Sequence, residues 1–248
     1  MDQILKYPRT KHIETSKWQT GDVRDYIAMS ELKTKNLVIE EKMDGSNSGI
    51  SFINGKLMLQ SRGHYLLGHP RELHFSYFKQ WANQHMIQLK ELLGERYIMY
   101  GEYLFAIHCI FYDQLPAFFM EFDIYDKEER VFLSTERRQK MLEGVEFIKS
   151  VKVLGTGKFD SLKELLSLFG KSNFISENPQ KVFSEKYPNN SSIHELDFKG
   201  EMEGLYIKWE DENKVLGNYK WVRASFIQTV LKSNHWVEKK MIKNLLNE

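Results

Sequence analysis

The dipeptide Asn54-Gly55 constrains the fold of this chain more than any other short feature. It separates two runs, 49–52 and 56–60, that have the composition of strands. Asn-Gly suits the left-handed backbone conformations that a two-residue hairpin turn requires. We therefore expect an antiparallel pair of strands around this dipeptide.

Other short runs also have the composition of strands. Residues 37–39 are apolar and lead into the charged residues 40–42, while the runs 97–104 and 117–125 are rich in aromatic and other apolar side chains. Aromatic and β-branched residues favour strands. Strands are predicted again at 204–209 and 214–222.

Helices are indicated by apolar residues that recur every three or four positions. Such spacing over 73–93, with Gly94 as a stop, predicts one long helix or two short ones. Helices are also predicted at 134–142 and at 162–169, and the second has a capping box at Ser161 to Glu164 and Gly170 after its end. A last helix is expected to begin near Ser225.

Residues 171–199 show little periodicity and contain Asn178-Pro179 and a Pro-Asn-Asn-Ser-Ser run. This composition predicts a mobile surface loop.

Composition excludes several classes of protein. Lysine and arginine total 35 and aspartate and glutamate 34, which gives a net charge of +1, so a polyanion must be bound by a local patch. The single cysteine, Cys109, cannot form an intrachain disulfide, which favours the cytoplasm. Neither a signal peptide nor an apolar run of about 18 residues is present, so we expect no membrane association. The histidines lack the spacing of a structural zinc site.

Lys42 stands at the end of a strand and is followed by Met43-Asp44-Gly45. A lysine that is partly desolvated and near other cations has a lowered pKa and can act as a nucleophile. Gly45 would let a phosphate approach the backbone. A surface lysine that ends an edge strand would have the same local sequence, so further segments must decide.

Six segments, in order, resemble the motifs of the covalent nucleotidyltransferases, the superfamily of ATP-dependent DNA and RNA ligases and mRNA capping enzymes. They are residues 42–45 (motif I), 61–63 (Ia), 100–103 (III), 119–124 (IIIa), 203–208 (IV) and 219–223 (V). Within the superfamily, Asn47 and the forms Gly101-Glu102-Tyr103 and Phe122-Asp123-Ile124 look most like RNA ligases of the phage and compact bacterial type.

The resemblance implies an α+β fold, the ligase adenylation-domain fold, in which antiparallel sheets form an ATP cleft flanked by helices. It also implies that Lys42 becomes covalently linked to AMP and that Glu203 binds Mg²⁺ or Mn²⁺. Glu102 is then expected at the ribose, Phe122 against the adenine, and the backbone around Glu41 at the edge of the base.

Other residues are expected at phosphates. The resemblance implies that Lys220 and Arg62, together with Lys208 and Arg223, bind the nucleotide phosphates. Asn47 is expected at the nucleotide phosphate or the incoming RNA end.

Each of these residues also has a purely structural interpretation. Phe122 alternates with other apolar residues and could belong to a core. Glu102 and Glu203 could face solvent, Arg62 could be a surface charge beside a turn, and Lys220 could protect an edge strand.

The domain organisation predicted from these segments is a single adenylyltransferase domain, 1–248. Its core covers about 38–223, with an insertion at 171–199 and a short basic helical tail at 224–248. After Val215 there are six basic residues against two glutamates, which suits an RNA backbone; the basic residues are Lys220, Arg223, Lys232, Lys239, Lys240 and Lys243. The tail is too short for the OB domain that DNA ligases and capping enzymes append.

The sequence is therefore interpreted as an ATP-dependent RNA ligase that joins an RNA 5′-phosphate to a 3′-hydroxyl. A repair partner protein is a further candidate for recognising the ends. A minimal ATP-dependent DNA ligase remains open, as does a non-catalytic ATP or RNA sensor with a ligase-like pocket.

Overall fold

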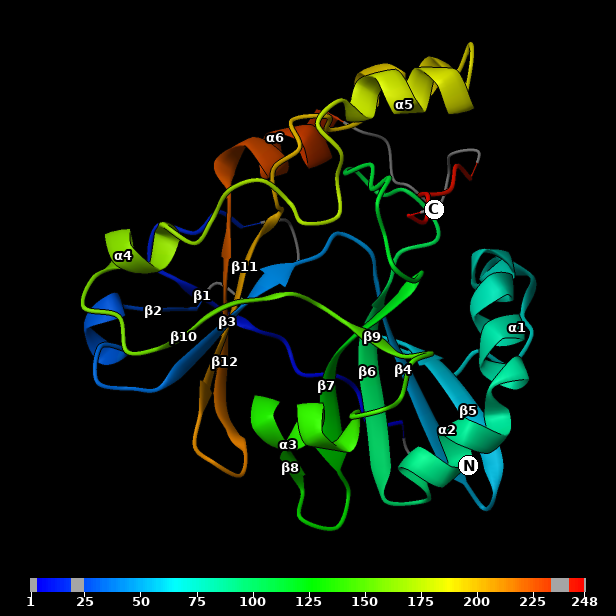
Figure 1. The fold of residues 1–248 in the computed structure, drawn as a ribbon, viewed down its shortest axis with the longest axis vertical. Helices are drawn as coiled ribbons and strands as arrows, with labels where there is room; N and C mark the ends of the chain where they lie inside the picture. The colour runs from blue at the N-terminus through cyan, green and yellow to red at the C-terminus, as the bar shows by residue number, and fades with distance from the viewer. Residues whose placement is uncertain (1–3, 19–24, 233–240, 248) are drawn as a thin grey trace.

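The computed structural model describes residues 4–18, 25–232 and 241–247. Two sheets form its centre (Figure 1). The strands of the first sheet are β1 (Lys11–Ile13), β2 (Tyr26–Ile27), β3 (Leu37–Lys42), β10 (Val153–Gly157), β11 (Gly204–Glu210) and β12 (Val215–Val222). They run in the order β10-β3-β11-β12-β1-β2. The pairs from β10 to β12 are antiparallel, and β1 pairs in parallel with both β12 and β2.

The second sheet consists of β4 (Ser46–Ile53), β5 (Lys56–Ser61), β6 (Tyr97–Tyr103), β7 (Phe119–Asp126), β8 (Val131–Phe132) and β9 (Lys149–Ser150). Its order is β5-β4-β6-β7-β8, and β9 pairs in parallel with β7. All other neighbours in this sheet are antiparallel. The expected α+β fold built on antiparallel sheets is confirmed.

The helices lie outside the two sheets (Figure 1). They are η1 (Met29–Glu31), η2 (Pro70–Phe75), α1 (Ser76–Gln84), α2 (Met86–Leu93), α3 (Thr135–Met141), α4 (Leu162–Leu166), α5 (Pro179–Lys186), η3 (Ser191–Glu195) and α6 (Ala224–Lys232). The 73–93 region is thus two short helices, and both follow η2. The Oγ atom of Ser161 accepts a hydrogen bond from Glu164 N at 3.1 Å, as the capping box predicts, but α4 ends at Leu166, before the predicted end at 169.

The predicted hairpin is confirmed. Asn54 and Gly55 have φ of 49° and 73°, and Ile53 pairs with Lys56 directly across the turn. Two consecutive left-handed residues are what a tight hairpin of this kind needs, and glycine reaches that region without steric cost.

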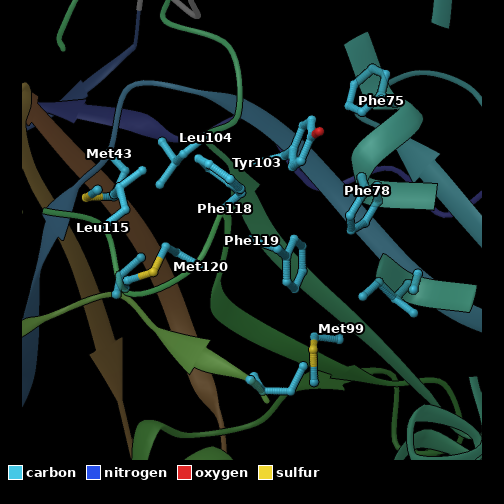
Figure 2. Close-up of a cluster of buried hydrophobic side chains, with 14 of the residues drawn as sticks. Met43, Phe75, Phe78, Met99, Tyr103, Leu104, Leu115, Phe118, Phe119 and Met120 are labelled. Atoms are coloured by element: carbon cyan, nitrogen blue, oxygen red, sulfur yellow. The ribbon is translucent and has the colours of Figure 1, made fainter. Parts of the chain in front are cut away.

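The chain passes from the first sheet to the second directly after Lys42. β3 ends at Lys42, Met43 is buried in the main hydrophobic core, and β4 begins at Ser46. Figure 2 shows Met43 beside Leu104 and Leu115 in that core. Packing of Met43 therefore fixes the turn that carries the lysine.

Residues 171–199 form folded structure, which corrects the expectation of a mobile loop. They contain α5, and Phe183 of that helix is fully buried with its ring centroid 5.2 Å from that of Phe111. The sequence lacked a helical signal because most of the segment packs through isolated aromatic residues rather than through a periodic stripe.

The predicted helical tail is only partly helical. Its first part is α6, but residues 241–247 run extended beside 104–115, where Asn244 N donates to Phe105 O at 2.9 Å and Leu245 N donates to Tyr112 O at 2.9 Å. Lys239 and Lys240 lie outside the described residues. In the part of the chain that the structure describes, no helix has the length and apolar character needed to cross a bilayer.

Candidate active site

A cavity of about 1290 Å³ opens where the two sheets meet. Eight of the ten residues singled out in the sequence line it: Glu41, Lys42, Asn47, Arg62, Glu102, Phe122, Glu203 and Lys220. They come from both sheets, because β3 and β12 carry some of them and β4, β6 and β7 carry others. Segments far apart in the sequence thus contribute to one site.

Lys42 makes an ion pair with Glu203 at the centre of this cavity. Lys42 Nζ lies 2.8 Å from Glu203 Oε2. The contact follows from strand register, because Lys42 pairs with Gly204 of β11 and Glu203 immediately precedes that residue. The side chain of Lys42 is 23% exposed and that of Glu203 is 4% exposed, so the amine is the more accessible partner.

The charge environment of Lys42 differs from the one expected. Burial alone would lower the Lys42 pKa, but the negative charges of Glu203, Glu102 and Asp44 outweigh burial and raise it. The expectation that neighbouring cations lower this pKa is therefore wrong for the protein without a bound nucleotide. These surroundings favour the ammonium form of Lys42, and a neutral amine at this position would need a change in the charges around it.

The carboxyl groups around Lys42 have raised pKa values. Burial raises the pKa of Glu102 to about 8 and that of Glu203 to about 7, although Lys42 lowers both. Each also repels its acidic neighbours: Glu203 and Asp44 act on Glu102, and Asp44 acts on Glu203. Added positive charge at this point would relieve the repulsion between the carboxylates.

These carboxylates fit a divalent cation in part. Among the described residues, no group of three His, Cys, Asp or Glu side chains is placed to hold a metal ion. Mg²⁺ commonly takes one or two protein carboxylates and fills its remaining positions with water and substrate phosphates. Glu203 and its crowded acidic neighbours suit a cation of that kind.

Asp44 anchors the turn after Lys42. Its Oδ2 accepts hydrogen bonds from Cys109 N at 2.8 Å and Ile110 N at 2.9 Å, and its own N donates to Tyr112 Oη at 2.9 Å. Sequence analysis assigned no role to Asp44. The sequence signal for a role was the position of Asp44 two residues after Lys42. Its hydrogen-bond partners could not be predicted, because they lie more than sixty residues away in the chain.

Glu41 is bound by the segment 171–199. Its carboxylate accepts hydrogen bonds from Ser172 Oγ, from Asn173 N at 3.1 Å and from Asn173 Nδ2 at 3.0 Å. The Glu41 carboxylate is thus held by hydrogen bonds to the segment 171–199. The contact expected between the backbone around Glu41 and the edge of a base stays a prediction.

Phe122 lies in an aromatic group at another wall of the cavity. The ring of Tyr7 meets Phe122 edge to face at a centroid distance of 5.1 Å, and Tyr206 lies 6.2 Å from Phe122. Tyr7 and Tyr206 also share a hydrogen bond of 2.6 Å between their hydroxyls, and Tyr7 donates to Asp123. Sequence analysis missed both tyrosines as site residues, because their proximity to Phe122 depends on how the sheets pack.

Lys208 lies beneath this aromatic group, which corrects its expected place at a phosphate. It is fully buried, and its Nζ lies 3.0 Å from Glu40 and 2.9 Å from Asp123. It also donates to Phe122 O. Lys208 shares a strand face with Tyr206, and two ion pairs hold its charge inside the protein.

Arg223 is likewise held away from the cavity. Its guanidinium donates to Asp197 Oδ2 at 2.6 Å, to Met202 O at 2.7 Å and to Ser225 Oγ at 2.6 Å. Side chains alternate along a strand. Lys220 and Val222 therefore share the face of β12 that lines the cavity, whereas Arg223, directly after the end of β12, is absent from the cavity lining.

Comparison with known proteins identifies relatives of this chain. A family model described as RNA ligase matches residues 35–224. A Naegleria gruberi RNA ligase variant solved with AMP and Mn has a TM-score of 0.58 at 17% identity, covering 91% of this chain and 57% of that one. A variant of the same ligase with ATP and Mn has a TM-score of 0.57 at 14% identity, covering 94% and 64%.

These structures show a shared fold. A further structure, the Naegleria gruberi RNA ligase with PPi, has a TM-score of 0.56 at 16% identity. The present chain covers 53% to 64% of the length of these ligase chains. A search of curated proteins gives no match.

Proposed function

Because this chain belongs to the RNA ligase family, we propose that it is an ATP-dependent RNA ligase that works through a lysyl-AMP intermediate on Lys42. The substrates in this proposal are ATP and RNA ends that carry a 5′-phosphate and a 3′-hydroxyl. The observation that carries it is the Lys42–Glu203 ion pair of 2.8 Å inside a cavity at the junction of the sheets.

In the first step, Lys42 Nζ forms a bond to the α-phosphorus of ATP. The bond from that phosphorus to the β-phosphate oxygen breaks, and pyrophosphate leaves. Lys42 loses one proton to become a neutral amine and a second as the phosphorus–nitrogen bond forms, and both protons pass to water. The ion pair of Lys42 with Glu203 is broken in the process. Lys220 lines the same cavity and provides positive charge for the phosphates.

In the second step, an oxygen of the RNA 5′-phosphate attacks the phosphorus of the lysyl-AMP. The phosphorus–nitrogen bond breaks, and the amine of Lys42 is restored. In the third step, the 3′-hydroxyl attacks the RNA phosphorus and AMP leaves. Every step transfers a phosphoryl centre, so positioning and charge stabilisation supply most of the catalysis.

A divalent cation, Mg²⁺ or Mn²⁺, would be held by Glu203 together with nucleotide phosphates. When bound, it would neutralise phosphate charge and favour the neutral amine of Lys42. Glu102 lies on β6 of the second sheet, and its Oε1 accepts a hydrogen bond from Gly45 N at 3.1 Å. In this proposal it accepts a hydrogen bond from a ribose hydroxyl. Phe122, with Tyr7 beside it, offers an aromatic surface for the base.

The proposal extends to RNA repair in the cytoplasm, where a partner protein would help to recognise the ends. The cytoplasm is supported by Cys109, a free and buried thiol, which suits a reducing compartment.

The test is intact-mass spectrometry of the purified protein after incubation with ATP and Mg²⁺. We expect the mass to rise by one AMP in the wild type and in Lys56→Ala, an exposed lysine at the start of β5. Lys42→Ala should show no adduct. AMP already bound after purification must be removed or counted first.

The adenylylated protein is then offered 5′-phosphorylated RNA and DNA strands of the same sequence. Joining of RNA supports the proposal, whereas joining of DNA in preference would indicate a DNA ligase, because the 2′-hydroxyl distinguishes the two polymers. Tight ATP binding without any adduct would indicate a sensor.

A further inference from the structure

The cavity is larger than one nucleotide needs. Its volume of about 1290 Å³ exceeds the roughly 300–1,000 Å³ of a typical small-molecule site. Lys42, its carboxylates and Phe122 occupy the part between the sheets. The lining also includes the segment 62–75 and one side of α6, so the cavity has room for a second ligand group.

Three histidines line the cavity from the segment 62–75. His64, His69 and His74 follow one another at intervals of five residues, and we call them the imidazole wall. His64 and His69 are exposed, and Ser61 Oγ lies 3.1 Å from His64 Nδ1, which orients that ring. Burial lowers the pKa of His74, and the nearby charges of Glu72 and His64 act on it in opposite directions.

Acidic charge on this side of the cavity is already neutralised. Glu72 lines the cavity, but its Oε2 lies 2.5 Å from Lys79 Nζ and accepts a hydrogen bond from Gly68 N at 2.9 Å. Arg62, which is exposed, adds a cation at the start of the same segment. The wall therefore presents hydrogen-bond donors, and Arg62 beside it adds positive charge, in contrast to the carboxylates around Lys42.

A metal ion is not the natural ligand of this wall. No group of three potential ligands among the described residues has the arrangement of a metal site. Imidazole and guanidinium donors suit phosphate oxygens instead. The cavity lining also includes Phe226, Ile227 and Val230 of α6, of which Phe226 and Ile227 are largely buried in the core. This apolar wall is the side of the cavity on which the sugar and base that accompany a terminal phosphate would lie.

We propose that the imidazole wall binds the 5′-phosphate of the RNA strand that receives AMP. The proposal rests on the ligase function proposed above and assigns a place to its second substrate. The wall would hold the phosphate before the second step, with the terminal nucleotide against α6.

The test separates the two phosphate-dependent steps. His64→Ala/His69→Ala changes two exposed side chains, so the fold should be retained; His194→Ala, an exposed histidine of η3, is the matched control. Adduct formation with ATP is measured by intact mass. Transfer of AMP is then measured in a single turnover from each adenylylated protein to a 5′-phosphorylated oligoribonucleotide.

We expect the double variant to form the adduct at a rate within about twofold of the wild type but to transfer AMP about tenfold more slowly or worse, because charge-assisted hydrogen bonds to phosphate are lost. His64→Arg/His69→Arg should restore most of the transfer, since arginine retains the donors. The control should behave as the wild type.

Three outcomes would overturn the proposal, two of them kinetic and one from binding. Slowed adduct formation with normal AMP transfer would place the β- and γ-phosphates of ATP at the wall, and normal rates in both assays would leave the wall without a phosphate.

A binding measurement is independent of the chemistry. Fluorescence anisotropy compares the binding of 5′-phosphorylated and 5′-hydroxyl oligoribonucleotides. If the wild type forms no adduct, the ligase function fails, but a preference for the 5′-phosphate that the double variant loses would still support the phosphate site. No such preference would overturn it.

Discussion

Lys42 is surrounded by more negative than positive charge, and this balance governs how it can react. Glu203, Glu102 and Asp44 together raise its pKa although burial opposes them. These charges therefore favour the protonated, ammonium form of the Lys42 amine. In the proposed ligase, binding of nucleotide and cation would shift that balance, so nucleophilicity would appear only when the substrate is present.

Replacement of Glu203 tests this balance. Glu203→Gln keeps the shape of the side chain but removes its charge, which the proposal assigns to holding the cation. We expect the rate of adduct formation to fall by about a hundredfold or more, the effect typical of losing one electrostatic contact to a transition state. Quench-flow or timed intact-mass measurement gives the rate, with Glu212→Gln, an exposed glutamate, as control. An unchanged rate would contradict the role of Glu203.

The carboxyl groups of the site predict a pH dependence of stability. The pKa of Glu102 is raised from 4.5 to about 8, so the folded protein binds a proton that the unfolded chain releases. Its contribution to the unfolding free energy is complete below about pH 4.5 and is lost as the pH rises towards about 8. Glu102→Gln should therefore have a flatter profile between about pH 5 and 8 than the wild type in urea denaturation. Parallel profiles would refute the shift.

At the scale of elements, the segment 171–199 is fixed to the strand that carries Lys42. Glu41, the neighbour of Lys42 on β3, accepts hydrogen bonds from Ser172 and from both nitrogens of Asn173. These hydrogen bonds fix the segment 171–199 to the buried end of β3. The sequence showed the segment and the strand but gave no sign of their contact.

Asn173→Asp places a second carboxylate beside Glu41. The two negative charges should repel, which would release the segment at a cost of about 1–3 kcal/mol in unfolding free energy. Limited proteolysis should then cut within 171–199 faster than in the wild type. Asn178→Asp is the matched control, because Asn178 is exposed at the N-cap of α5, where aspartate is equally suitable. Equal cleavage of the two variants would show that the contact does not hold the segment.

At the scale of the whole molecule, a buried set of charges joins the two sheets beneath the cavity. Arg138 of α3 lies 2.5 Å from Glu40 of the first sheet and 3.2 Å from Glu121 of the second. Lys208 makes a similar connection between Glu40 and Asp123. The relative position of the sheets, and hence the shape of the cavity, depends on these pairs.

Arg138→Met removes the cation that two buried carboxylates share. Because Arg138 is 1% exposed and its partners are fully buried, the unfolding free energy should fall by about 3–5 kcal/mol. Arg137→Met is the control on the same helix, since the pair of Arg137 with Glu129 is partly exposed and should contribute less than about 1 kcal/mol. Urea denaturation measures both. A small loss in Arg138→Met would show that the buried pairs are not needed to join the sheets.

The strands β3 to β7, β11 and β12 and the place of Lys42 at a strand end could be predicted from the sequence because their signals are local. The short strands β1, β2, β8 and β9, and β10, were not predicted. The Asn54-Gly55 turn, the apolar run before Lys42 and the capping residue Ser161 depend on side chains within a few positions of one another. The ordered motifs added the family and the cavity residues that they contain. Strand alternation then places Lys220 in the cavity, but the choice of face was not made from the sequence.

Tertiary structure alone decided which charges serve the site. Lys208 belongs to the same motif as Glu203, and Arg223 belongs to the same motif as Lys220. Each of these two cations nevertheless makes a buried ion pair with a residue from another part of the chain. The placement of Tyr7 beside Phe122 has the same origin. A local pattern fixes backbone conformation, whereas the partner of a charge or of a ring depends on packing between segments far apart in the chain.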